Sequence, residues 1–192
     1  MHRISLLTAT SRQVKTECDA IMVTIPIIIK QVPPESVGGK ILFCGSDGRF
    51  YNARGRELKP SLCAKHLNGG HRGGSKYPFM RQFGDRSCHH LVYETFVGPR
   101  TPGMEIDHVN GNMMDWSADN LEEVTTAENI RRAKYIRALR EVFPLHAQTF
   151  QRADYHRFFA MPFDEFQAML ATFRHTDPQT RIEYEMSHHV EN

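Results

Sequence analysis

The chain lacks the paired cysteines that mark structural zinc sites. It has four cysteines, at positions 18, 44, 63 and 88, and they are too far apart for any C-x-x-C pair. The same spacing gives no disulfide framework, so we expect reduced thiols in a protein of the cytoplasm. It also argues against a small zinc-stabilised interaction domain.

Long apolar runs are missing as well. The apolar run Ile21–Ile29 is interrupted by Pro26 and is too short to span a bilayer. The first residues do not show the basic-then-apolar pattern of a signal peptide. We therefore expect no membrane contact.

An excess of one charge sign is small over the whole chain, but the charges are unevenly distributed along it. The net charge is only +2, which by itself requires no polyanionic partner. Between Lys40 and Arg100, however, eleven basic residues stand against four acidic ones, a net charge of +7. From Phe143 onward four basic residues stand against seven acidic ones, a net charge of −3. This asymmetry favours a polyanion partner on the upstream part, with a solvated surface as the alternative.

Local patterns predict a mixed α+β chain. A hairpin is expected between residues 40 and 51, around the turn pair Asp47-Gly48. A short helix is expected from His89 to Phe96, and strands at Met104–His108 and Leu121–Val124. A longer helix should run from about Thr126 to Val142, before Pro144. Two C-terminal helical stretches are expected, a weaker one over 145–159 and one with the apolar stripe Phe163, Phe166, Leu170 and Phe173, which should pack on the rest of the protein.

These patterns divide the chain into three parts. Residues 1–39 end in a linker-like Val32-Pro33-Pro34-Glu35 and Gly38-Gly39, and form an N-terminal leader of unknown role. Residues 40–142 are the expected functional domain, with its core at 89–142. Residues 143–192 are a helical extension.

The segment His89–Ala133 resembles the HNH endonucleases of phages and introns. The motifs that carry the resemblance are His89-His90-Leu91-Val92, Asp107-His108-Val109-Asn110-Gly111-Asn112, Asn120-Leu121-Glu122 and Glu128-Asn129. They occur in order and at the right separations. The likeness extends more loosely from residue 40 to residue 135.

The resemblance implies a ββα-metal core, in which two strands joined by a long loop are followed by a helix. His108 would be the general base, because a neutral imidazole accepts a proton from water near neutral pH. Asn120 would brace the loop and orient that imidazole. Asp107 and Asn129 would hold one divalent ion. Because these ligands are oxygen donors, Mg²⁺ or Mn²⁺ is favoured over zinc.

Two groups of basic residues are candidates for double-stranded DNA contact. Arg49, Arg54, Arg56 and Lys59 belong to the hairpin region. Arg131 and Arg132 follow Asn129 on the expected helix, where positions 129, 132, 136 and 140 share one side. Arg132 is thereby a candidate for contact with the scissile phosphate. Trp116, the single tryptophan, is expected to plug the space under the loop rather than to stack on a base.

Three hypotheses follow. The first is a metal-dependent DNA endonuclease in the cytoplasm of a bacterial or phage-infected cell. The second is a DNA-binding regulatory protein that has the same fold but no catalysis. The third, a zinc-stabilised domain, is disfavoured by the cysteine spacing. The target sequence, nicking or double-strand cutting, and the oligomeric state stay open.

Overall fold

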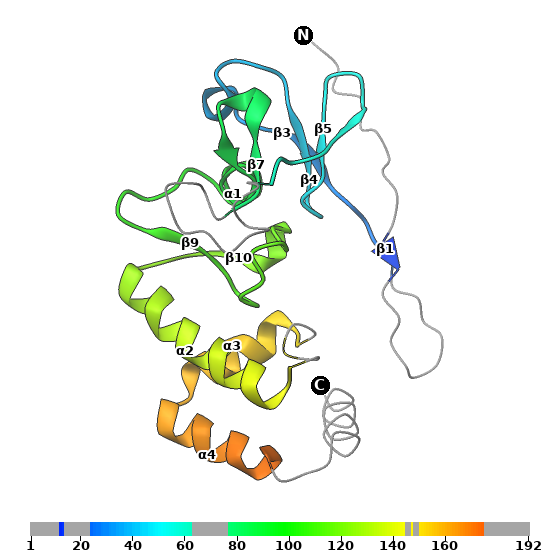
Figure 1. Cartoon of the computed structure of the whole chain (residues 1–192). Coiled ribbons are helices and arrows are strands. Elements are labelled where there is room, and N and C mark those ends of the chain that lie inside the picture. Colours follow the sequence, from blue (N-terminus) through cyan, green and yellow to red (C-terminus); the bar gives the residue numbers. More distant parts are fainter. Residues whose placement is uncertain (1–11, 14–23, 63–76, 145–146, 148–149, 175–192) are drawn as a thin grey trace. The chain divides into compact units, whose positions relative to one another are not determined.

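The computed structural model describes residues 12–13, 24–62, 77–144, 147 and 150–174 (Figure 1). These residues form small sheets and four α-helices, which agrees with the predicted α+β class. The chain divides into two compact units. The first comprises Met1–His108 and Asn112–Glu123, and the second comprises Val109–Gly111 and Val124–Asn192. None of the described helices is both long and apolar enough to cross a membrane.

The first unit contains a four-stranded antiparallel sheet in the order β3-β4-β5-β6. Its strands are β3 (Ile29–Gln31), β4 (Phe43–Gly45), β5 (Phe50–Tyr51) and β6 (Glu57–Leu58). The turn between β4 and β5 contains Gly48 at a φ of 82°, a left-handed conformation that glycine adopts without strain. The hairpin predicted between residues 40 and 51 is therefore confirmed. Upstream, β1 (Arg12–Gln13) pairs with β2 (Thr24–Ile25).

This sheet extends upstream of the boundary predicted at residue 39. β3 pairs with β4, and the Val32 amide donates to the Leu42 carbonyl at 2.8 Å. A 3₁₀ turn, η1 (Pro34–Val37), follows. Val32 and Val37 are both buried in the core of the first unit. Residues 29–37 thus belong to the sheet and its core, because they cover a strand edge and supply apolar side chains to it.

A helix packs on the sheet through its apolar face. The antiparallel pair β7 (Phe79–Met80) and β8 (Arg86–Ser87), with η3 (Arg81–Phe83) between them, leads directly into α1 (Cys88–Phe96). Leu91 and Val92 of α1 are fully buried, which confirms the predicted helical face. Cys44 of β4 and Cys88 of α1 are free thiols in the same core, and burial raises the pKa of both.

Two further strands follow α1 in the chain. β9 (Glu105–His108) and β10 (Leu121–Val124) pair with each other, within one residue of the predicted bounds. The connection between them ends in the 3₁₀ turn η4 (Ala118–Asn120).

The second unit consists mainly of three helices. They are α2 (Thr126–Val142), α3 (Arg152–Ala160) and α4 (Phe163–Arg174). The bounds of α2 confirm the predicted helix, and its N-cap is Thr125, whose Oγ1 accepts from the Glu128 amide. α3 begins at Arg152 rather than at residue 145, and part of the preceding segment lies outside the described residues.

One core joins all three helices. It contains Tyr135 and Leu139 of α2, Phe159 of α3, and Phe166 and Leu170 of α4. The predicted stripe on α4 therefore packs as expected. Because α2 shares this core, it belongs to the same compact unit as the helices after residue 143, whereas the sequence pattern had placed a boundary between them.

Candidate active site

Asp107 and His108 are neighbours at the end of β9, and their side chains leave the strand on opposite faces. Ile106 and His108 are buried, whereas Glu105 and Asp107 are half-buried, so burial alternates with the period of a strand. Ile106 belongs to the core of the first unit. The His108 imidazole therefore lies on the core side, 5% exposed, and the Asp107 carboxylate lies on the more open side.

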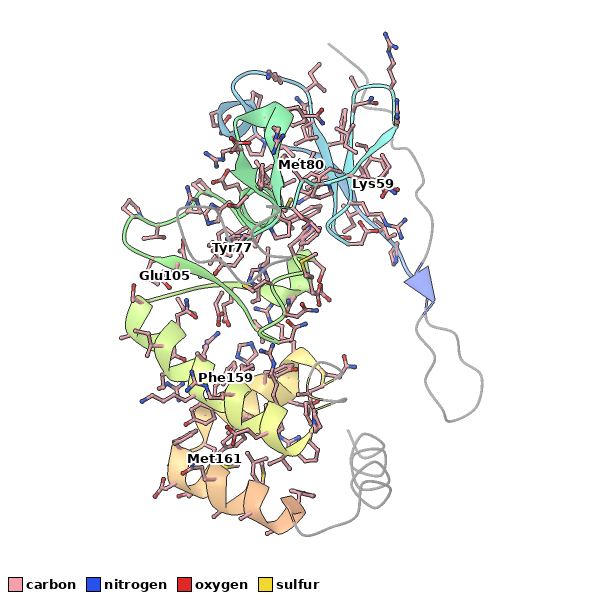
Figure 2. The ribbon with its side chains drawn as sticks, in the orientation of Figure 1. Lys59, Tyr77, Met80, Glu105, Phe159 and Met161 are labelled. Carbon is pink, nitrogen blue, oxygen red and sulfur yellow. The ribbon has the colours of Figure 1, made fainter. Side chains whose placement is uncertain are left out.

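Other rings surround the His108 imidazole. The Tyr77 ring stacks nearly parallel to it, with an interplanar angle of 10° and centroids 5.8 Å apart. The His89 ring lies 5.1 Å away at 57°. His89 also contacts Tyr77 at 4.4 Å and His90 at 4.2 Å. The candidate base thus sits in a cluster of aromatic and imidazole rings drawn from three segments of the first unit; Tyr77 is labelled in Figure 2.

His90 is uncharged at neutral pH. Burial lowers its pKa to about 4, and the nearby Arg100 and Arg86 guanidiniums act in the same direction against Glu94. Glu94 itself binds both arginines, at 2.8 Å from Arg86 Nη2 and 2.9 Å from Arg100 Nε. Burial would raise the pKa of Glu94, but a Ser36 hydrogen bond and the two arginines hold it below its usual value. This ion-pair group fixes α1 to the segments on either side of it.

Asn120 ties the loop between β9 and β10 together at its end. The side chain is buried, and Nδ2 donates to the Asp115 carbonyl at 2.6 Å. The Asn120 amide donates to the Ser117 carbonyl, and Ser117 Oγ donates to Asp115 Oδ1 at 2.7 Å. A short network of this kind restricts the loop to one conformation.

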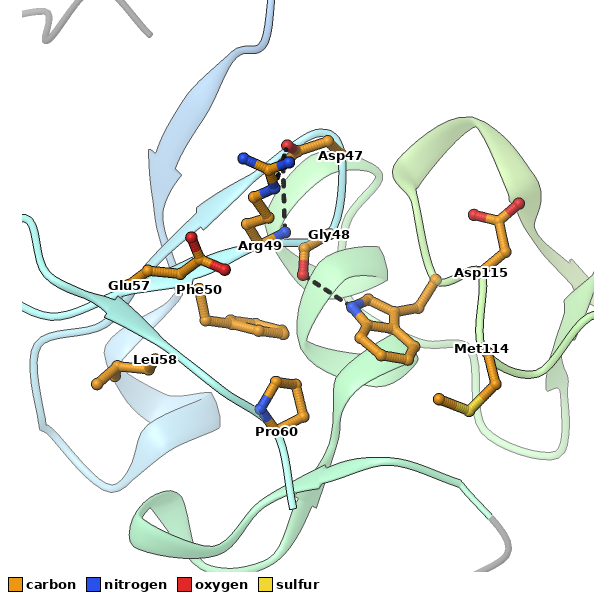
Figure 3. Close-up of a pocket in the computed structure, with 10 residues that line it drawn as sticks. Asp47, Gly48, Arg49, Phe50, Glu57, Leu58, Pro60, Met114 and Asp115 are labelled. Atoms are coloured by element: carbon orange, nitrogen blue, oxygen red, sulfur yellow. Dashed lines mark hydrogen bonds and ion pairs between the residues drawn. The ribbon is translucent and has the colours of Figure 1, made fainter. Parts of the chain in front are cut away.

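Trp116 connects this loop to the β4–β5 hairpin. Its Nε1 donates to the Gly48 carbonyl at 2.8 Å, and the Ala118 amide donates to the Ser46 carbonyl at 2.9 Å. The indole packs against the core, as predicted for a plug under the loop. Figure 3 shows the surface pocket, of about 150 Å³, beside this contact, with Met114 and Asp115 on one side and the hairpin residues on the other.

Asn129 lies in the second unit, in the first turn of α2. It is half-buried, and its amide donates to the Thr125 carbonyl. The preceding Glu128 binds two guanidiniums, Arg131 and Arg132, at 2.7 and 2.8 Å. The hydrogen bond from Arg131 lowers the pKa of Glu128 to about 2, with Arg132 acting in the same direction.

Arg131 and Arg132, predicted to contact DNA, make extensive contacts inside the second unit. Arg131 Nη1 donates to the Phe159 carbonyl at 2.7 Å, and the Tyr135 hydroxyl donates to the Met161 carbonyl at 2.6 Å (Figure 2 labels Phe159 and Met161). Arg132 is 9% exposed and lies over the Phe159 ring at 4.9 Å. Both arginines fasten the start of α2 to the end of α3.

The basic residues of the hairpin region are more exposed to solvent than Arg131 and Arg132. Arg54, Arg56 and Lys59 are all exposed on or beside the β5–β6 turn (Lys59 in Figure 2). The turn is held by Asn52, whose Oδ1 accepts from the amides of Arg54 and Arg56. Arg49 is half exposed and forms an ion pair with Asp47 at 3.3 Å. The structure thus gathers three exposed positive charges at one turn.

Residues 86–131 match the family model of the HNH endonucleases. Over this segment the chain is similar to the HNH endonucleases. The matched segment, about a quarter of the chain, runs from β8 into α2 and includes Asp107, His108, Asn120 and Asn129. No curated protein and no solved structure matches the chain. An HNH domain implies a nucleic-acid substrate, and HNH nucleases generally use divalent metal ions.

The donor chemistry of the HNH segment fits a hard cation. Among the described residues no group of three or more His, Cys, Asp or Glu side chains could hold a metal ion. Mg²⁺ commonly takes only one or two protein carboxylates and completes its shell with water and substrate phosphate. The half-buried carboxylate of Asp107 suits that pattern, whereas tetrahedral zinc would call for nitrogen or sulfur ligands.

Sequence reasoning did not assign a role to Tyr77 or His89. His89 formed part of the HNH resemblance, but its ring contact with His108 joins residues nineteen positions apart. Tyr77 follows a glycine-rich stretch and belongs to no motif. The signal available in the sequence was a histidine in the first turn of the predicted helix, two and three residues before the apolar positions Leu91 and Val92.

Proposed function

We propose that this protein is a metal-dependent DNA endonuclease that hydrolyses phosphodiester bonds, with His108 as its general base. The observation that carries the proposal is the buried His108 imidazole beside Asp107, at the end of a strand inside the HNH segment. A surface Asp-His pair without function would not require an imidazole enclosed by other rings.

His108 takes a proton from the attacking water in this mechanism. General base catalysis contributes about 10²–10⁴ in rate, which is roughly 3–5 kcal/mol of barrier. The position of the base matters as much as its basicity, because a base must lie within hydrogen-bond reach of the proton that it accepts. Asn120 supports the reaction indirectly, by fixing the loop that follows His108 through its bond to the Asp115 carbonyl.

Asp107 and Asn129 are the proposed ligands of one Mg²⁺ or Mn²⁺ ion. Asp107 contributes a carboxylate on the open face of β9. Asn129 enters the proposal from the resemblance alone, since it lies in the second unit. Together these two residues would hold the ion, which, when bound, would act as a Lewis acid toward the phosphate oxygens and offset the charge on the leaving oxygen.

Double-stranded DNA is the proposed substrate. Arg54, Arg56 and Lys59 offer exposed positive charge, with which they would contact backbone phosphates and give affinity rather than specificity. Arg49 would add to them by exchanging its ion pair with Asp47 for a phosphate. A DNA role for Arg131 and Arg132 remains a prediction, because such contacts compete with their bonds to Glu128 and α3.

The test is cleavage of supercoiled plasmid by the full chain, with Mg²⁺ or Mn²⁺ and with EDTA. We expect nicked or linear product only with the metal, and an unchanged circular dichroism spectrum in EDTA. His108→Ala should remove cleavage while affinity for a labelled duplex in Ca²⁺ stays within a few fold. The matched control is His156→Ala, a histidine of α3. Binding without cleavage by the wild-type protein would instead support the regulatory alternative, and near wild-type cleavage by His108→Ala would refute the assignment of the base.

A further inference from the structure

We propose that Tyr77 and His89 are positioning residues that fix the ring plane of His108 for its role as base. The inference rests on the proposed function, because it concerns the same imidazole. It adds two side chains that neither touch the reacting atoms nor hold the metal. Their role is to restrict the His108 side chain to one of the rotamers that its torsions allow.

The ring geometry carries the first step. Tyr77 lies nearly parallel to the His108 ring at 5.8 Å, while His89 meets it at 57° and 5.1 Å. The two restraining rings also contact each other, with centroids 4.4 Å apart. Two contacts at such different angles block rotation about both side-chain torsions, whereas a single stacked ring would still allow sliding. His89 is 3% exposed and His108 is 5% exposed, so solvent does not compete for this space.

The backbone explains why the two restraining rings keep their places. Tyr77 lies two residues before the start of β7, and His89 lies in the first turn of α1, which begins directly after β8. The pairing Phe79↔Ser87 holds these strands in register. The Cys88 amide donates to the Pro78 carbonyl at 2.9 Å, which joins the neighbour of His89 to the neighbour of Tyr77. Both rings are therefore carried side by side at the open end of one short antiparallel ribbon.

The core then fixes that ribbon relative to β9. Met80, Cys88, Leu91 and Val92 are buried in the same core as Ile106, which shares a face of β9 with His108. Packed interiors do not deform continuously, so the ring cluster inherits the rigidity of the core. Active groups need placement to within about 0.5 Å and 10–20°. A cluster anchored in this way provides that tolerance for the imidazole.

The experiment measures single-turnover cleavage rates and duplex affinity for Tyr77→Leu, Tyr77→Phe and His89→Leu in the full chain. Losing a ring should lower the cleavage rate by about 10- to 100-fold, because a misplacement of about 1 Å costs on the order of 10² in rate. Affinity measured in Ca²⁺ should change less than about threefold. Tyr77→Phe keeps the stacked ring and should retain near wild-type cleavage, which separates the ring from the hydroxyl.

A double-mutant cycle shows whether the effect passes through His108. The baseline of the cycle is the residual single-turnover rate of His108→Ala, about 10²–10⁴-fold below that of the wild type. In that background Tyr77→Leu and His89→Leu should cause no further loss, because there is no ring left to position. An equal loss in both backgrounds would overturn the inference, as would Tyr77→Leu with wild-type cleavage. Full cleavage by His108→Ala alone would instead refute the proposed function, so the two failures are distinct.

A measurement on the wild-type protein guards against variants that do not fold. Proton NMR should show cross-relaxation between the His89 and His108 ring protons, with the His108 signals assigned by their absence in His108→Ala. Cross-relaxation between the Tyr77 and His89 rings serves as the internal reference, since these centroids are closer. If the reference pair is seen and the His89–His108 pair is not, the positioning role is excluded.

Discussion

Gly48→Ala is expected to destabilise the first unit through two separate effects at one atom. Gly48 has a φ of 82°, and an L side chain in the left-handed region costs roughly 1–2 kcal/mol. A Cβ there would also lie 2.6 Å from Trp116 Cδ1 and 2.8 Å from Nε1, well inside contact distance. The indole must move, and its hydrogen bond to the Gly48 carbonyl, worth about 0.5–1.5 kcal/mol, is lost or strained. We expect a total loss of about 1.5–3.5 kcal/mol.

Gly55→Ala is the matched control in the next turn of the same sheet. Gly55 has a φ of 74°, but a Cβ there would meet nothing within 4 Å, so only the backbone cost of roughly 1–2 kcal/mol applies. Guanidinium unfolding is followed by circular dichroism and by the emission of Trp116, the single tryptophan. Only Gly48→Ala should shift the native emission to the red. Equal destabilisation by both variants, with unchanged emission, would refute the hairpin–loop contact.

Three further predictions follow. Burial, aided by the Arg100 cation, lowers the pKa of His90 from 6.5 to about 4. The unfolded chain therefore binds the proton first, and the free energy of unfolding should fall by about 1–2 kcal/mol as the pH drops from about 6.5 to 4, less than the full equivalent of the shift because solvent screens the partly exposed ring. His90→Gln should flatten this pH dependence of urea unfolding; an unchanged profile would contradict the assignment. Replacing Arg54 and Arg56 with Ala should reduce the slope of log affinity against log salt by up to about two units, because each phosphate contact contributes about 0.9 to that slope. The slope is measured in duplex titrations with Ca²⁺, and an unchanged slope would show that the DNA binds elsewhere. Truncation after Val142 should lower the helical signal by more than the removed helices account for, since α2 loses its core partners; retention of a stable α2 would show that it needs no C-terminal packing.

The sequence predicted the structure best where a local pattern decides the backbone. The Asp47-Gly48 pair indicated the hairpin, and the glycine is the residue that adopts the left-handed turn. The apolar spacing of Leu91 and Val92 indicated the face of α1. The order of strand, loop, strand and helix from β9 to α2 was also predictable. The turn and cap residues that begin or end these elements lie within a few positions of them in the sequence.

Contacts between distant segments were not predictable in this way. The pairing of β3 with β4 depends on which strand covers an exposed edge, and nothing in residues 29–31 specifies that partner. Helical spacing placed Arg131 and Arg132 on α2, but it contained no information on the Phe159 carbonyl that Arg131 binds. The stacking of Tyr77 on His108 could not be predicted for the same reason, because it depends on the core that holds both segments in place.

The structure also changes what the charge pattern means for DNA binding. A net charge of +7 between residues 40 and 100 counts every cation equally, yet Arg86 and Arg100 are both paired with Glu94, and their charge is used to hold α1. A guanidinium that is paired with a half-buried carboxylate must break that ion pair before it binds a phosphate. The free energy lost with the ion pair largely offsets the free energy gained with the phosphate. Arg54 and Arg56 form no ion pair with any residue that the structure describes, so a phosphate can bind them without that exchange. Among the described cations between residues 40 and 100, the β5–β6 turn therefore carries exposed charge that a phosphate can reach, and the salt dependence of binding should respond to Arg54 and Arg56 more than to Arg86 and Arg100.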